Sequence, residues 1–166
     1  MYFKCIILTG ALLALGACHQ SDKTSRSLQH RMDSLEARLA NTYKPGLGEF
    51  MSGIQVHHDK LWFAGMDQNW ALANFEINEI RESLNDIRVY CTDRPEIKQL
   101  PMIDLPLESL QSAIQQQNVI TFKTGFITLT NTCNTCHQAT KHAFNVIKVP
   151  SAPPFSNQDF APDNKK

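Results

Sequence analysis

The chain has 166 residues, which is enough for one domain of ordinary size. Apolar residues make up 42% and charged residues 19%, a composition typical of a globular protein rather than a disordered one. Lys plus Arg and Asp plus Glu number 16 each, so the formal net charge is zero. Such a balance disfavours broad electrostatic binding to phosphates, and we expect no nucleic-acid partner.

The N-terminal segment has the pattern of an export signal. Lys4 precedes an apolar run from Cys5 to Leu15, which is too short to span a bilayer and is followed by small residues. Residues 15–18 read LGAC and resemble the lipobox of bacterial lipoproteins. This resemblance implies cleavage before Cys18 and acylation of Cys18, so that acyl chains would tether the mature protein to a membrane.

The residue after the lipobox cysteine carries a further implication. His19 follows Cys18 where an Asp would stand in many lipoproteins of the inner membrane. The resemblance therefore implies the periplasmic face of the outer membrane. Removal of the signal takes away one Lys and no acid, which gives the mature chain a formal charge of 15 − 16 = −1.

A short helix is predicted after a polar tether. Residues 19–27 are polar, and Leu28, Met32, Leu35 and Leu39 then recur at helical spacing. The stripe covers less than two heptads, which is too short to associate firmly on its own. It favours a helix that acts as a spacer or packs against its own domain, and the alternative is a homodimer formed through the stripe.

Apolar spacing predicts four longer helices in the remainder of the chain. The first covers about residues 48–65, and the second begins at residue 67 or 69 and ends near residue 90. Three prolines over 91–106 predict a loop or crossover. Helical spacing resumes at Leu107, and Asn118 interrupts it before the last helix. In that last helix the apolar period of 3.6 favours a helix over a strand despite many β-branched residues.

These elements indicate an all-α fold, with a helical bundle preceded by an extra N-terminal helix. The last residues are rich in proline and lack periodicity, which predicts an extended or disordered tail. The expected division is a signal peptide at 1–17, a tether and short helix at 18–47, the bundle at 48–148 and the tail at 149–166.

Residues 131–137 read NTCNTCH and contain C-x-x-C-H, the attachment signature of a c-type haem. Cys133 and Cys136 are three positions apart, so on a helix their thiols project from the same side and can each bond one vinyl group. His137 can then offer an imidazole nitrogen to the iron. The motif predicts one covalently attached haem c, in the compartment to which the signal directs the chain.

Two other uses of the cysteine pair are open. A redox-active C-x-x-C opens a helix after a strand, whereas this motif ends a helical pattern. A structural zinc site would need a further ligand, which His142 could provide. Cys91 remains as an odd thiol, and we expect it to be a buried residue near a helix end, with an intermolecular disulfide as the alternative.

The arrangement resembles the cytochrome c prime family and related four-helix-bundle c-type cytochromes, because a single C-x-x-C-H stands near the end of the last of four helices. The segments TNTCNTCHQATKHAFNVIKVP and QVHHDKLWFAG are also similar to segments of bacterial monohaem proteins. The family resemblance implies a four-helix bundle in which Cys133 and Cys136 form the thioethers, His137 is the proximal ligand, and helix 48–65 covers the distal face of the haem.

Helix 48–65 carries the candidates for a sixth ligand. His58 shares an apolar stripe with Met51, and an imidazole buried beside iron would find a strong ligand there. His57 and Met51 are the alternatives, and a distal site without a protein ligand is a further one. His142 is too close in sequence to His137 to reach the opposite face.

These features predict a lipid-anchored electron carrier with an unidentified redox partner protein, and not an enzyme. A gas-binding or gas-sensing haem protein is the alternative, since an open distal site would serve it. Peroxidase activity ranks last because no Arg is close in sequence to His57 or His58.

Overall fold

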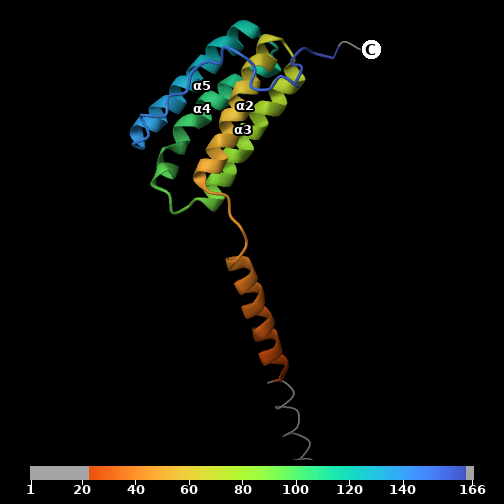
Figure 1. Cartoon of the computed structure of the whole chain (residues 1–166), viewed down its shortest axis with the longest axis vertical. Helices are drawn as coiled ribbons and strands as arrows, with labels where there is room; N and C mark the ends of the chain where they lie inside the picture. The colour runs from red at the N-terminus through yellow and green to blue at the C-terminus, as the bar shows by residue number, and fades with distance from the viewer. Residues whose placement is uncertain (1–22, 164–166) are drawn as a thin grey trace, which may run out of the picture. The chain divides into compact units, whose positions relative to one another are not determined.

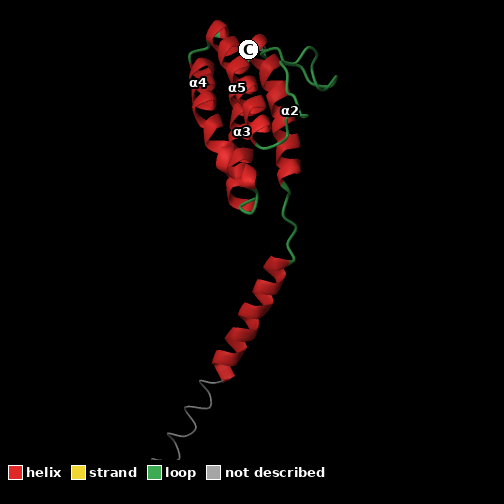
Figure 2. Ribbon diagram, turned by 90° about the vertical axis from the view of Figure 1, so that its left-hand side faces the viewer, coloured by secondary structure: helices red, strands yellow, loops and turns green. Residues whose placement is uncertain are grey.

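The computed structural model describes residues 23–163, and every regular element in that range is helical (Figure 2). The expected all-α fold is therefore confirmed. The elements of the main unit are α2 (Leu47–Met66), α3 (Trp70–Tyr90), the 3₁₀ helix η1 (Pro95–Ile103), α4 (Asp104–Gln115) and α5 (Val119–Ala139). The expected signal peptide and the lipobox residue Cys18 lie outside the described residues. Within the described range, none of the helices combines the length and apolar character that crossing a bilayer requires.

The chain divides into two compact units, one ending at Lys44 and the other beginning at Pro45. In the first unit, residues 23–40 form one helix. This helix begins earlier than expected, because residues 23–27 are helical and do not form part of a tether. Their sequence, KTSRS, contains no Gly or Pro that would stop a helix, so the element extends toward the N-terminus.

The main unit is built from two helical hairpins, α2–α3 and α4–α5, whose connecting turns have the same structure. Gln68 after α2 and Gln117 after α4 adopt left-handed backbone conformations, with φ of 58° and 53°. The next residues, Asn69 and Asn118, donate their backbone N–H to the carbonyl five residues earlier, at 2.8 and 3.1 Å. Their side chains accept hydrogen bonds from the first turn of α3 and of α5. Each Gln-Asn pair thus ends one helix and caps the next.

The two hairpins pack into one apolar core. Figure 1 shows α2 beside α3 and α4 beside α5, and α2 also contacts α5. The largest fully buried apolar side chains come from all four helices and include Leu61, Ile77, Leu110, Phe122 and Phe126. Burial of these side chains provides the main free energy that holds the helices together.

The segment 91–106 differs from the loop that its prolines predicted. It contains η1, whose Leu100 and Ile103 are buried, and α4 begins at Asp104. Pro95 stands at the start of η1 and Pro106 in the first turn of α4, where the missing N–H has no partner within the helix. Proline at these positions begins a helix and does not end one.

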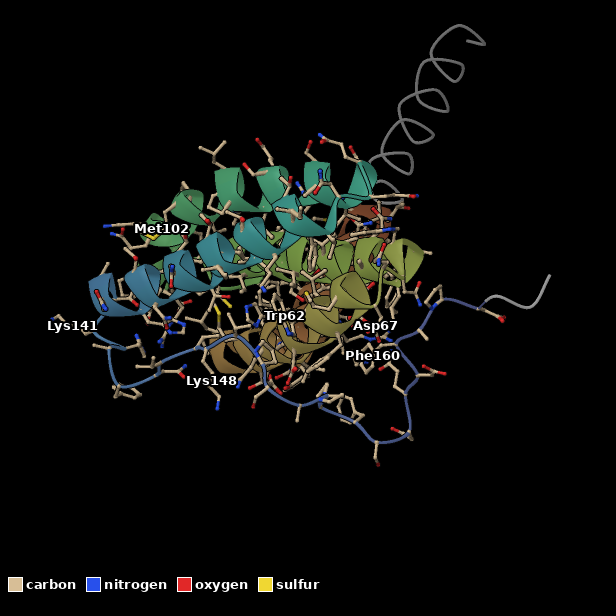
Figure 3. The ribbon with its side chains drawn as sticks, turned by 90° about the horizontal axis from the view of Figure 1, so that it is seen from above. Trp62, Asp67, Met102, Lys141, Lys148 and Phe160 are labelled. Carbon is tan, nitrogen blue, oxygen red and sulfur yellow. The ribbon has the colours of Figure 1, made fainter. Side chains whose placement is uncertain are left out.

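After α5 the chain has no regular secondary structure but packs on the helices. Figure 3 shows it passing from Lys141 by Lys148 to Phe160. Phe160 is 4% exposed, and its ring centroid is 5.7 Å from that of Phe63 on α2. The side chain of Asn69 donates to the Ala161 carbonyl at 3.2 Å. The tail therefore covers one side of α2.

A close contact between α2 and α5 makes one glycine sensitive to substitution. A Cβ atom at Gly65 would lie 2.1 Å from the Phe122 ring, whereas a Cβ at Gly53 would meet nothing within 4 Å. We expect Gly65→Ala to lower the free energy of unfolding by about 2 kcal/mol through overpacking. Gly53→Ala, also within α2, is the control and should raise it by roughly 0.5–1 kcal/mol. Urea denaturation checks both values, and equal effects of the two changes would contradict the contact.

Candidate functional site

The C-x-x-C-H residues lie in the last turns of α5 and line a cavity. Cys133, Cys136 and His137 face this cavity from α5, and Met51 and His58 face it from α2. It contains about 520 Å³ of space free of protein atoms, part of it open to solvent. The rest of its wall is apolar and consists of Ile54, Ile80, Leu84, Leu100, Ile103 and Leu129. The fold thus brings Met51 and His58 of α2 together with the C-x-x-C-H motif of α5 in one apolar hollow.

The imidazole of His137 has a defined proton position. Its Nδ1 lies 2.6 Å from the carbonyl oxygen of Asn145. A carbonyl can only accept, so Nδ1 carries the proton and Nε2 keeps a free lone pair. Histidines that bind metal usually donate their other ring N–H in this way to a carbonyl or carboxylate. His137 is therefore in the tautomer that can ligate iron through Nε2.

A polar contact fixes the segment that holds His137. Asn134, which lies between the two motif cysteines, donates from Nδ2 to the Ile147 carbonyl at 2.7 Å and accepts from the Ile147 N–H at 2.8 Å. These two bonds attach the stretch 143–149, which we call the C-terminal strap, to α5. The strap then presents the Asn145 carbonyl to His137. Neither asparagine can be identified as a site residue from the sequence, because no local pattern connects positions so far apart.

Asn134→Ala is expected to release the strap. The change removes two hydrogen bonds and should lower the free energy of unfolding by about 1 kcal/mol. It should also raise the hydrogen-exchange rate of the Ile147 amide, since that amide loses its acceptor. Asn145→Ala is the matched control, because the backbone carbonyl that binds His137 remains. Amide exchange measured by NMR checks both, and an unchanged Ile147 amide in Asn134→Ala would contradict the strap.

The two motif thiols are shielded from solvent rather than activated. Burial raises the pKa of Cys133 to about 12, and burial also raises the pKa of Cys136. Cysteines of redox-active C-x-x-C motifs show the opposite shift, because such motifs stabilise the thiolate. A thioether sulfur is uncharged, so this environment suits a covalently substituted sulfur better than a reactive thiolate.

His58 lies deep in the same cavity in its neutral form. It is 5% exposed, and burial lowers its pKa from 6.5 to about 4. Its Nε2 is 2.9 Å from the hydroxyl of Thr130, which itself donates to the Phe126 carbonyl at 2.9 Å. The hydroxyl therefore accepts from His58, and Nε2 carries the proton. The His58 ring packs on the ring of Phe126, and the two ring centroids are 4.4 Å apart.

The alternative ligands from α2 occupy different surroundings. Met51 lines the cavity and lies two turns before His58 on the same face of the helix. His57 does not line the cavity, and its Nδ1 lies 2.7 Å from a carboxylate oxygen of Glu76 on α3. Glu76 is 1% exposed, so this pair is directed into the α2–α3 contact. Of the two adjacent histidines, only His58 is placed to face a group bound between α2 and α5.

A polar hollow adjoins the apolar cavity and shares Met51 and His137 with it. Here Arg94 donates to Glu96 at 2.8 Å, and His142 Nε2 lies 4.0 Å from the same carboxylate oxygen. A backbone hydrogen bond and the Arg94 guanidinium hold the pKa of Glu96 below its usual range. His142 is thus directed to Glu96.

The structure also bears on the zinc alternative and on the third cysteine, Cys91. Within residues 23–163, no three His, Cys, Asp or Glu side chains come together as a ligand set for a metal ion, so the zinc alternative gains no support from the geometry. Cys91 is 4% exposed, caps the end of α3 and belongs to the core, as expected for a buried residue.

Comparisons with protein-family models, with curated proteins and with solved structures find no match to this chain. The motif, the cavity and the side chains that line it are therefore the observations that bear on its function.

Proposed function

We propose that the protein is an exported, lipid-anchored c-type cytochrome that carries electrons through one covalently attached haem. Cys133 and Cys136 would form the two thioether bonds, and His137 would be the proximal ligand. In this proposal α2–α5 form a four-helix bundle of the cytochrome c prime type. The observation that carries the proposal is the apolar cavity that joins the whole C-x-x-C-H motif on α5 to His58 and Met51 on α2.

The side chains in this cavity fit the requirements of a haem. Two thiols on one side of a helix, an imidazole with a free Nε2 and an apolar wall are the groups that such a cofactor needs. When bound, the haem would supply reversible one-electron chemistry. The Asn145 carbonyl would then fix the orientation of His137, and the apolar wall would exclude water from the iron and tune its potential.

The cellular setting of the proposal depends on the lipobox. Acylation of Cys18 would hold the protein at the periplasmic face of the outer membrane, and its redox partner would be a protein that reaches that surface. The formal charge of the mature chain is close to zero, so long-range electrostatic steering of a partner would be weak.

The direct test is the mass of the denatured protein. After expression in the periplasm of a host competent in cytochrome c maturation, we expect the intact mass to exceed that of the mature, acylated polypeptide by one haem. The denatured protein should keep a visible haem absorption band, because the thioethers survive unfolding. A mass from such a host that lacks the increment of one haem would overturn the proposal.

A specific observation also favours a gas-binding haem protein as the second candidate. In the structure the Nε2 proton of His58 is donated to Thr130, so that nitrogen has no lone pair to offer to iron. If this bond persists with the cofactor in place, the distal side lacks a ligand from Nε2 and can accept a diatomic gas. A visible spectrum that shifts with carbon monoxide would favour this candidate, and an unshifted low-spin spectrum would favour the electron carrier.

A further inference from the structure

The helix at residues 23–40 exposes a narrow line of apolar side chains. Leu28, Met32, Leu35 and Leu39 are 54%, 54%, 56% and 66% exposed. Their spacings of four, three and four place them within an arc of about 60° on a helix that turns about 100° per residue. A helix that packs on a domain core or lies in a membrane interface has an apolar face of about 100° or more, whereas a line this narrow is typical of a coiled-coil seam.

The charged residues beside this apolar line differ on its two sides. Arg31 and Arg38 directly precede Met32 and Leu39 and lie on one side, and Glu36 directly follows Leu35 and lies on the other. In heptad terms the arginines occupy g positions and Glu36 an e position. In a parallel, in-register pair of helices a g residue faces the e residue five positions later on the partner helix, so Arg31 of each copy would face Glu36 of the other.

We propose that this helix is a dimerisation element and that its occupant is the same helix of a second copy, parallel and in register. The parallel direction rests on the lipid anchor of the proposed function, because two chains tethered at Cys18 begin at the same membrane surface. Tethering also raises the effective concentration of the helices, which compensates for a seam of less than two heptads. A membrane surface is the disfavoured occupant, because the apolar line is narrower than the face that an interfacial helix buries among the headgroups.

Disulfide crosslinking in isolated membranes tests the seam with the full-length, lipidated protein. In Leu35→Cys the two new thiols would meet across the seam, and mild oxidation by oxygen with a copper catalyst should crosslink most of the protein. Ala37→Cys, on the opposite face of the same helix, is the matched control. We expect it to yield about tenfold less dimer.

A charge exchange tests the partner contact. In the Leu35→Cys background, Arg31→Glu should lower the crosslinked fraction about fivefold, because it sets acids against each other in both contacts. The further change Glu36→Arg should restore it. Equal crosslinking of Leu35→Cys and Ala37→Cys, or no recovery in the charge-exchanged protein, would overturn the proposal. A lipid-free form that begins at His19 can be tested for binding to vesicles that contain phosphatidylglycerol. Binding to these vesicles, combined with no crosslinking in Leu35→Cys, would also overturn the proposal.

The same membranes separate this proposal from the proposed function. Their haem absorption reports on the C-x-x-C-H motif, and detergent phase partitioning reports on the anchor at Cys18. A protein that carries haem and partitions with detergent but does not crosslink would contradict the dimer alone.

Discussion

The double substitution Cys133→Ser/Cys136→Ser is expected to abolish covalent haem attachment completely. A serine hydroxyl does not add to a vinyl group under conditions in which a thiol does, so no thioether can form at either position. The intact mass should fall by the mass of one haem, and the denatured protein should lose its visible absorption band. Mass spectrometry and absorption of the denatured protein measure this directly.

Single substitutions and a third cysteine sharpen the result. Cys133→Ser and Cys136→Ser alone should each retain one attachment point, with a visible band that shifts because one vinyl group stays free. Cys91→Ala is the matched control: Cys91 is buried in the core and away from the cavity, so haem content should not change. Covalent haem in the double variant, or its loss in Cys91→Ala, would contradict the assignment of the motif.

The helices were predictable because their signals are local. The strongest case is α5, which the apolar period assigned to a helix against the strand preference of its Thr and Ile residues. The structure shows how these threonines are accommodated. Hydroxyls such as those of Thr124, Thr128 and Thr132 donate to the carbonyl four residues earlier, at 3.2, 3.0 and 2.9 Å. A Thr in this position satisfies its polar group within the helix, so it does not compete with helical structure.

One local prediction was wrong for a physical reason. The three prolines over 91–106 predict a loop, but Pro95 and Pro106 lie in the first turn of η1 and of α4, where a proline lacks only an N–H that has no partner in the helix. The segment therefore folds as η1 followed by α4, and its buried Leu100 helps to close the cavity. The apolar residues between these prolines were the signal in the sequence that the segment would pack against the core.

Helical periodicity predicts which face of a helix each site residue occupies, and this part of the site could be predicted from the sequence. The stripe of α2 that contains Met51 and His58 was expected to face the core, and both residues line the cavity. The contacts of His57 with Glu76, of His58 with Thr130 and of Asn134 with the strap could not be derived. Each depends on the packing of elements distant in sequence, and periodicity carries no information about which elements become neighbours.

The second large effect concerns the acid stability of the haem-free protein, for which Cys133→Ser/Cys136→Ser provides the material. In the folded state burial holds the pKa of His58 at about 4, while its ordinary value is 6.5. As the pH falls through 6.5, the unfolded chain takes up a proton at His58 that the folded chain does not bind until near pH 4. Unfolding is therefore favoured, and the free energy of unfolding should fall by about 3 kcal/mol between pH 6.5 and 4 from this group alone.

The contribution of His58 can be isolated by difference. His58→Gln keeps an N–H donor for Thr130 but does not titrate, so in the haem-free background its stability should depend less on pH by the same amount, about 3 kcal/mol. Urea denaturation at pH 7, 5.5 and 4 measures both proteins, and other titrating groups cancel in the comparison. A difference between the two proteins that stays constant with pH would show that His58 is not held neutral by burial. A difference that grows as the pH falls would show that burial in the cavity keeps the His58 imidazole uncharged in the folded protein, where it donates to Thr130.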